Sequence, residues 1–190
     1  MVLGKQTLKN TIITFFTAVN PTYLWNMSKV IFIMGVSGCG KTTIGKALAE
    51  QLHFSFMEAD DFHPQANKDK MQQGIPLTDT DRWPWLKSLR AAMELTFPNG
   101  VVVACSALKE SYRSVLEENL NPLHVQWVYL EGTVETLRQR LAQRKGHFMN
   151  PNLLPSQMAT LEVPAAALQF SITMPPPTII RQIIEKIHEA

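Results

Sequence analysis

Continuous apolar runs alternate along the chain with segments of helical periodicity. The run Val30–Met34 contains no polar position, which is typical of a strand that is buried on both faces of a parallel sheet. Shorter candidate strands follow at Ser55–Glu58, Val101–Cys105 and Val125–Leu130. The alternation predicts repeated strand–helix–strand units, and therefore a three-layer α/β fold with a mainly parallel sheet flanked by helices.

Apolar side chains between and after these runs recur at helical spacing. Residues Ile44 to Leu52 and Leu137 to Leu141 each place apolar positions on one helical face, so both segments predict helices that pack on the sheet. A C-terminal amphipathic helix that covers the sheet is predicted by Ile179, Ile180, Ile183, Ile184 and Ile187.

Three segments lack either pattern. Gly146–Ser156 is polar and contains prolines, which predicts a mobile loop, and Pro175–Pro177 predicts an extended connection. Residues 1–26 include a modest apolar stretch, but threonines interrupt it and no signal-cleavage site follows. We interpret residues 1–26 as a poorly ordered extension rather than a targeting segment, and we expect a single domain over residues 27–190.

Composition narrows the classes of protein that fit. The 190 residues suit one domain, and 45% hydrophobic with 18% charged residues is typical of a globular protein. A net charge of +2 without a long basic run argues against a nucleic-acid partner, and no segment predicts a membrane span. Cys39 and Cys105 lie in no metal-binding pattern, and the histidines show no zinc-ligand spacing. We expect reduced thiols in a cytoplasmic protein.

A glycine-rich motif of the form G-x-x-x-x-G-K-[ST] lies between the first predicted strand and the first predicted helix. It consists of Gly35, Val36, Ser37, Gly38, Cys39, Gly40, Lys41 and Thr42, with Thr43 directly after it. Successive backbone N–H groups of such a loop face phosphate oxygens, and the helix that follows adds its positive end. The motif predicts ATP binding, with Lys41 at the β- and γ-phosphates and Thr42 on Mg²⁺. We interpret Cys39 as inert.

The remainder of the chain favours a small-molecule kinase over other nucleotide-binding classes. A GTPase needs the guanine-reading pattern N-K-x-D, and the segment Asn67–Lys70 ends in lysine instead of aspartate. A large ATPase needs more chain to couple to a partner. A non-catalytic ATP-binding regulator remains an alternative, because a phosphate-binding loop alone does not require catalysis.

Two carboxylates follow the second predicted strand. Glu58 and Asp60 alternate along what we expect to be an extended segment, so both side chains would leave on the same face, toward the phosphate-binding loop. Asp60 is the candidate catalytic base for the attacking hydroxyl, and Glu58 is the candidate metal ligand. The alternative is a solvated acidic turn, which the position at a strand end beside the loop argues against.

Arginines gather on the predicted helix that precedes the polar loop. Arg140 and Arg144 lie four residues apart and therefore share one face of this helix. Cations there would neutralise charge on the phosphoryl group during its transfer, whereas an exposed, purely solvated face is the alternative.

Five segments of the chain carry a resemblance to a known family. They are Gly35 to Thr43; Asp60 to Pro64 with Asn67, Lys70 and Met71; Gly74 to Leu86; Cys105 to Lys109 with Tyr112 and Arg113; and Arg144 to Met149, followed by Ser156, Gln157, Leu161 and Glu162. In order and spacing these segments resemble the gluconate kinase family, relatives of shikimate kinase among the P-loop kinases. The resemblance spans Met27 to about Pro164 and departs from the family in the apolar stretch Ala165–Leu168, which leaves the register of the last strand open.

The resemblance implies a substrate site. Asp60 is similar to the acid that contacts the reacting hydroxyl, and His63 would bind a sugar hydroxyl, although a structural hydrogen bond is the alternative for a lone histidine. Basic residues that would face the carboxylate of a sugar acid are Arg82, Lys109 and Arg113.

The resemblance also implies a lid around residues 144–157, with Arg140 and Arg144 near ATP and Arg144 acting in catalysis with Asp60 and Lys41. The implied activity is that of a gluconokinase, which uses Mg²⁺ and ATP to convert D-gluconate to 6-phospho-D-gluconate. Members of the family are commonly homodimers. A kinase of the same fold that acts on another hydroxy acid, such as shikimate, or on a nucleotide is the alternative.

Overall fold

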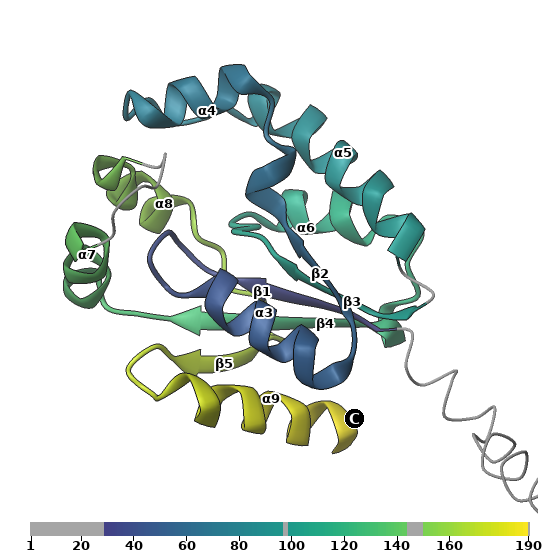
Figure 1. The fold of residues 1–190 in the computed structure, drawn as a ribbon. Coiled ribbons are helices and arrows are strands. Elements are labelled where there is room, and N and C mark those ends of the chain that lie inside the picture. Colours follow the sequence, from purple (N-terminus) through teal and green to yellow (C-terminus); the bar gives the residue numbers. More distant parts are fainter. Residues whose placement is uncertain (1–28, 97–98, 144–149, 190) are drawn as a thin grey trace, which may run out of the picture.

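A five-stranded parallel sheet forms the centre of the molecule (Figure 1). The computed structural model describes residues 29–96, 99–143 and 150–189, so the predicted 1–26 extension lies outside the described residues. The strands, in their order across the sheet, are β2 (Ser55–Glu58), β3 (Val101–Ala104), β1 (Val30–Met34), β4 (Val125–Glu131) and β5 (Leu168–Ser171). The four strands predicted from apolar runs are confirmed within a residue.

The register brings the carboxyl ends of β1, β2 and β3 to one edge of the sheet. Ala104 is the Cα partner of both Ile33 and Glu58. The segments that follow these strands therefore begin side by side. In parallel α/β sheets this edge is where ligands bind.

Helices cover both faces of the sheet. The α-helices are α3 (Lys41–Leu52), α4 (Gln65–Gln72), α5 (Asp79–Thr96), α6 (Glu110–Glu117), α7 (Val134–Gln143), α8 (Leu154–Thr160) and α9 (Pro176–Glu189). Short 3₁₀ turns lie at η1 (Ala59–Phe62), η3 (Pro122–His124) and η4 (Pro151–Leu153). Helices α3 and α9 lie on one face, while α5 and α6 lie on the other (Figure 1).

Strand β1 shows why its sequence is apolar at every position. Ile31 and Ile33 belong to the core beneath α3 and α9, whereas Phe32 and Met34 belong to the core beneath α5 and α6. All five residues of the strand are fully buried. A central strand covered on both faces has no position that tolerates a polar side chain.

Two expectations for the loops were wrong. Pro176 and Pro177 are the first residues of α9 rather than an extended connection, because the fixed φ of proline and its missing N–H suit the first turn of a helix. The segment expected to be loop as far as Ser156 becomes helical at Pro151, where η4 begins and leads into α8. Residues 144–149 lie outside the described residues.

The start of β1 and the end of α9 meet. The Nζ of Lys29 donates a hydrogen bond to the carbonyl oxygen of Ile187 at 3.0 Å. Both cysteines are buried free thiols. Among the described residues, no helix has the length and apolar character needed to cross a bilayer.

Candidate active site

A cavity of about 300 Å³ opens beside the carboxyl edge of the sheet. Its walls come from the phosphate-binding loop, the end of β2 with η1, helices α4, α5 and α6, the segment after β3, and Arg140 of α7 with residues of η4 and α8. Residues far apart in the sequence therefore meet around one volume. This size is compatible with a small ligand next to a phosphate group.

The glycine-rich loop has a backbone that only glycine adopts readily. Gly35, Gly38 and Gly40 have φ values of 138°, 86° and 102°. A Cβ at Gly35 would also lie 2.8 Å from the Sγ of Cys39, which is buried beneath the loop. Since α3 begins at Lys41, the loop ends at a helix N-terminus and forms an anion site. The loop and its helix thus take the predicted strand–loop–helix form.

Two donor groups of the loop form hydrogen bonds within the protein. The Nζ of Lys41 donates to the carbonyl oxygen of Val36 at 3.2 Å, and the backbone N–H of Ser37 donates to Oε1 of Gln157 at 2.7 Å. Gln157 belongs to α8, so this helix reaches the phosphate-binding loop directly. A phosphate oxygen bound at Ser37 would compete with the side-chain oxygen of Gln157.

The candidate metal ligands lie together. The Oγ1 of Thr42 donates to Oε2 of Glu58 at 2.7 Å, and both residues line the cavity. Burial is the main cause that raises the pKa of Glu58, with the nearby Asp60 adding to it. Within the described chain, no group of three or more histidine, cysteine or acidic residues could hold a metal ion. A hydroxyl beside one carboxylate fits Mg²⁺, which keeps water and phosphate ligands.

Asp60 lines the cavity, but not by the route that we expected. Strand β2 ends at Glu58 and the chain turns into η1, so Glu58 and Asp60 do not alternate along one extended segment. The indole Nε1 of Trp85 fixes this turn by donating to the carbonyl oxygen of Ala59 at 2.7 Å. The 3₁₀ turn nevertheless brings Asp60 into the same cavity as Glu58 and Lys41.

His63 is a buried, stacked histidine. Its ring lies 4.0 Å from that of Trp85, centroid to centroid, and its Nδ1 lies 3.3 Å from Nδ2 of Asn67. Burial lowers the pKa of His63 to about 4, so the imidazole is neutral at neutral pH. Because His63 also lines the cavity, its position is compatible with either alternative, a structural hydrogen bond or a contact with a sugar hydroxyl.

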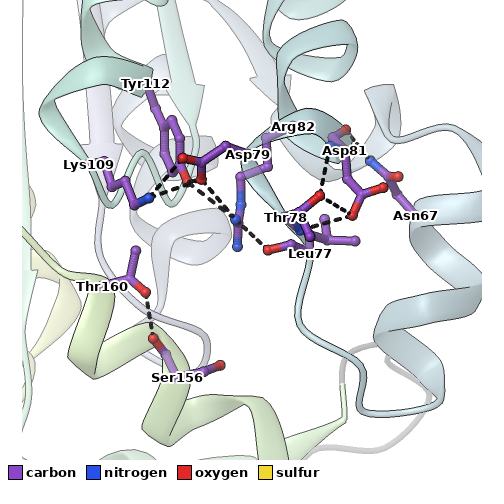
Figure 2. A network of polar contacts seen from close by, with 10 residues as sticks. All are labelled: Asn67, Leu77, Thr78, Asp79, Asp81, Arg82, Lys109, Tyr112, Ser156 and Thr160. Atoms are coloured by element: carbon purple, nitrogen blue, oxygen red, sulfur yellow. Dashed lines mark hydrogen bonds and ion pairs between the residues drawn. The ribbon is translucent and has the colours of Figure 1, made fainter.

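Arg82 lines the cavity from α5. Its Nη1 donates to the carbonyl oxygen of Leu77 at 2.6 Å and to the hydroxyl of Tyr112 at 3.2 Å (Figure 2). Tyr112 in turn donates a short hydrogen bond to Asp79. The hydrogen bond from Tyr112 is the main cause that holds the pKa of Asp79 below its ordinary value, and the hydrogen bond from Lys109 adds to it. The position of Arg82 in the cavity is therefore fixed by its neighbours.

Lys109 and Arg113 are not among the residues that line the cavity. The Nζ of Lys109 lies 3.0 Å from each carboxylate oxygen of Asp79. The buried Nη1 of Arg113 donates to the carbonyl oxygens of Ala107 at 3.0 Å and Glu162 at 2.8 Å. In this arrangement Lys109 balances an aspartate, and Arg113 ties α6 to two backbone segments.

Arg140 borders two cavities. It lines the large one, and it lines a smaller cavity of about 90 Å³ with Gly40, Thr43 and Pro176. Its Nη2 donates to the carbonyl oxygen of Ile172 at 2.7 Å. The smaller cavity continues from the phosphate-binding loop toward the start of α9. Arg144, the other predicted cation, lies outside the described residues.

Sequence reasoning assigned no role to three residues of the site. Tyr112 and Gln157 were noticed only as parts of the family resemblance, and Asp79 only within a longer segment. Tyr112 follows Lys109 by three residues and Asp79 precedes Arg82 by three, which is the spacing of neighbours on a helix. That spacing could have paired Tyr112 with Lys109 and Asp79 with Arg82. It could not have shown that the two pairs contact one another.

The fold and the cavity together define a small-molecule P-loop kinase. The family model described as shikimate kinase matches residues 37–165 of the chain. Curated relatives from eukaryotes and bacteria are named gluconokinase at 40–48% identity. The chain belongs to the gluconokinase family, which confirms the resemblance and the predicted fold class.

Individual relatives show how much of the chain this covers. A probable gluconokinase of Dictyostelium discoideum is 48% identical over 71% of this chain and 70% of its own length. The gluconokinase of Gluconobacter oxydans is 46% identical over 72% of this chain and 76% of its own. The crystal structure of a gluconokinase from Sinorhizobium meliloti 1021 matches with a TM-score of 0.76 and 40% identity, over 86% of this chain and 93% of that one.

Proposed function

We propose that this protein transfers the γ-phosphate of ATP to D-gluconate, giving ADP and 6-phospho-D-gluconate. One observation carries the proposal: a single cavity joins the phosphate-binding loop to Asp60, His63 and Arg82. The first group suits a nucleoside triphosphate, and the other three suit a polyhydroxy acid. The names of the relatives agree with this substrate.

ATP would bind with its phosphates on the loop, at Ser37 to Thr43, and with Lys41 at the β- and γ-phosphates. The smaller cavity shares Thr43 and Arg140 with the large one but is not lined by Asp60, His63 or Arg82, so we assign the base to it. A guanidinium such as Arg140 stacks readily on a planar base. The role of Arg144 stays a prediction.

The metal partner of ATP would be Mg²⁺, held on the protein side by Thr42 with Glu58 close by. Bound there, Mg²⁺ would neutralise charge on the β- and γ-phosphates. Glu58 must be ionised to help hold a cation. Since burial raises its pKa, acid should weaken metal binding at a pH above the ordinary range of a glutamate.

The chemical step needs a base and a stabilised phosphoryl group. The O6 hydroxyl of gluconate attacks the γ-phosphorus, and its proton passes to the carboxylate of Asp60. The new O–P bond forms while the bond from the γ-phosphorus to the β,γ-bridging oxygen breaks, so ADP leaves with that oxygen. Lys41 balances the charge on the phosphates through this step.

The acid end of gluconate would lie against Arg82, because a guanidinium pairs with a carboxylate through parallel hydrogen bonds. His63 is neutral at neutral pH and suits a sugar hydroxyl as donor or acceptor. Lys109 would act on this end indirectly, through its hydrogen bond to Asp79. Arg113 donates to the backbone oxygens of Ala107 and Glu162, so its position does not support direct contact with the sugar acid.

Three broader expectations belong to the same proposal. Two buried free cysteines suit a reducing compartment such as the cytoplasm. Residues 150–157, which contact both α4 and the phosphate-binding loop, suit a lid. A homodimer stays a prediction.

The test is ADP release by the purified protein with Mg²⁺ and ATP. D-Gluconate should stimulate release strongly, and shikimate, glucose and nucleoside monophosphates should not. Stimulation by shikimate instead would favour the activity named by the matching family model. ATP binding with no stimulation by any of these compounds would contradict the proposal.

A further inference from the structure

Arg82 is held by one of its terminal nitrogens. Within the described part of the chain, its hydrogen bonds all come from Nη1, which donates to Leu77 and Tyr112. The ion pair with Asp79, at 3.8 Å, also uses Nη1. The opposite edge of the guanidinium, formed by Nε and Nη2, is the edge that binds a carboxylate with two parallel hydrogen bonds.

The hydroxyl of Tyr112 is both acceptor and donor in this network. It accepts from Nη1 of Arg82 and donates to Oδ1 of Asp79. Because the hydroxyl hydrogen of Tyr112 is directed at Asp79, a lone pair of the hydroxyl oxygen accepts from the arginine. The ring itself is buried and packs edge-on against Trp83, with 5.5 Å between the centroids. The packing therefore holds the phenol ring of Tyr112 in one orientation.

The ion pair with Lys109 explains why Asp79 does not form a close ion pair with Arg82. The Nζ of Lys109 contacts both oxygens of Asp79 at 3.0 Å, whereas Arg82 stays 3.8 Å from the same carboxylate. Figure 2 shows Asp79 between Lys109, Tyr112 and Arg82, with Arg82 reaching on toward Leu77. The aspartate is largely balanced by Lys109, which leaves the charge of Arg82 for a ligand in the cavity.

We infer that Tyr112 and Asp79 are positioning residues that hold the Nε–Nη2 edge of Arg82 for the carboxylate of the substrate, and so select sugar acids over their neutral analogues. This inference rests on the proposed function. It assigns to Tyr112 and Asp79 an effect on the acid end of the substrate alone. Tyr112 lines the cavity and Asp79 does not. Both would act on the acid end of the substrate through Arg82.

The test is steady-state kinetics of the full chain with D-gluconate and with its neutral amide, gluconamide. Tyr112→Phe should raise the KM for gluconate about tenfold, since it removes a hydrogen bond to a charged group. The kcat and the KM for ATP should stay within about threefold, and so should kcat/KM for gluconamide. Asp79→Asn should change the KM for gluconate in the same direction.

Two further variants separate positioning from general damage. Tyr129→Phe removes the hydroxyl of a buried tyrosine on β4, outside the cavity, and should leave the KM for gluconate unchanged. In an Arg82→Lys background, Tyr112→Phe should add little further loss, because its effect passes through the arginine.

Several results would overturn the inference. Equal losses with gluconate and gluconamide, or losses that multiply in the double variant, would show a general structural role. If Tyr112→Phe fails to fold, Asp79→Asn decides alone, since Asp79 is half exposed and an unchanged KM there contradicts the inference. A wild-type protein that does not use gluconate contradicts the proposed function itself, whereas an active wild type with an unaffected Tyr112→Phe contradicts only this inference.

Discussion

Side chains in and beside the cavity differ in charge because they differ in burial and in hydrogen-bond partners. His63 is held neutral by burial, and Asp79 is held ionised by Tyr112 and Lys109. The guanidinium of Arg82 is anchored through Nη1. The cavity thus offers a neutral group for hydroxyls and a cation for a carboxylate, and the phosphate-binding loop lines the same cavity.

Asp60 is the first position to test at this scale. Asp60→Asn should lower kcat at least about a hundredfold while ATP binding changes little, because an amide cannot accept the hydroxyl proton. The neighbouring Asp61 is exposed and does not line the cavity, so Asp61→Asn should leave kcat unchanged within about twofold. A regulator that only binds ATP would show no loss with Asp60→Asn. Measured ADP release and a separate ATP-binding assay decide between these outcomes.

His63 makes the stability of the protein depend on pH. Its pKa falls from 6.5 to about 4 on folding, so between these values the unfolded chain binds the proton and the folded protein does not. The contribution of the neutral histidine to the free energy of unfolding is fully present above pH 6.5 and is lost as the pH falls toward 4. A shift of this size corresponds to about 3 kcal/mol in the free energy of unfolding.

Urea unfolding at pH 7.5 and pH 4.5 measures this effect. The loss of stability between the two should be smaller in His63→Gln than in the wild type by about 2 kcal/mol. His188→Gln, at an exposed position of α9, should keep the wild-type dependence. Equal losses in wild type and His63→Gln would show that His63 is not the group responsible.

At the scale of elements, α3 is fixed by its contact with the sheet. Gly45 faces the edge strand β2, and a Cβ at this position would lie 2.7 Å from Cε2 of Phe56. The close approach holds the N-terminus of α3 beside the end of β2, where Thr42 meets Glu58. The packing of the helix and the geometry of the proposed Mg²⁺ ligands are therefore linked.

Gly45→Ala should lower the free energy of unfolding by about 1–2 kcal/mol, because the methyl group overpacks the contact with Phe56. Alanine inside a helix is otherwise favoured over glycine by about 1 kcal/mol, so the sign of the change is the test. Combining Gly45→Ala with Phe56→Leu should recover most of the loss. Glu50→Ala, at an exposed position of α3, is the control and should change stability little. A more stable Gly45→Ala would contradict the close packing.

At the scale of the whole molecule, two parts that are distant in sequence meet across the cavity. The backbone N–H of Asn150 donates to the carbonyl oxygen of Met71 at 3.3 Å, and Leu153 packs with Met71 and Leu77. Helices α4 and α8 face one another across this region (Figure 1). We expect substrates to enter and leave as these contacts separate, since they join the two sides of the cavity.

The sequence predicts those elements whose burial or motif leaves a local pattern of residues. Strands buried on both faces leave continuous apolar runs, as β1 does, and the phosphate-binding loop has a specific motif. Strand β5 left no such run because, of its four residues, only Phe170 is fully buried. Arg113 matched the family motif, but no local pattern tells that its partners are the carbonyls of Ala107 and Glu162. Pairings set by distant backbone are the part that sequence patterns miss.

The contact between Lys29 and Ile187 means that the order of the elements along the chain can be changed without moving them. The start of β1 and the end of α9 lie at the end of the sheet opposite the carboxyl ends of the strands (Figure 1). A short linker from residue 189 to residue 29 would close the chain, and new termini could be opened after Asn119, an exposed position between α6 and η3. Such a circular permutant should keep ADP release with gluconate within about threefold of the unpermuted residues 29–189. If it holds its fold but loses turnover, the two ends of the chain matter to the cavity on the far side of the sheet.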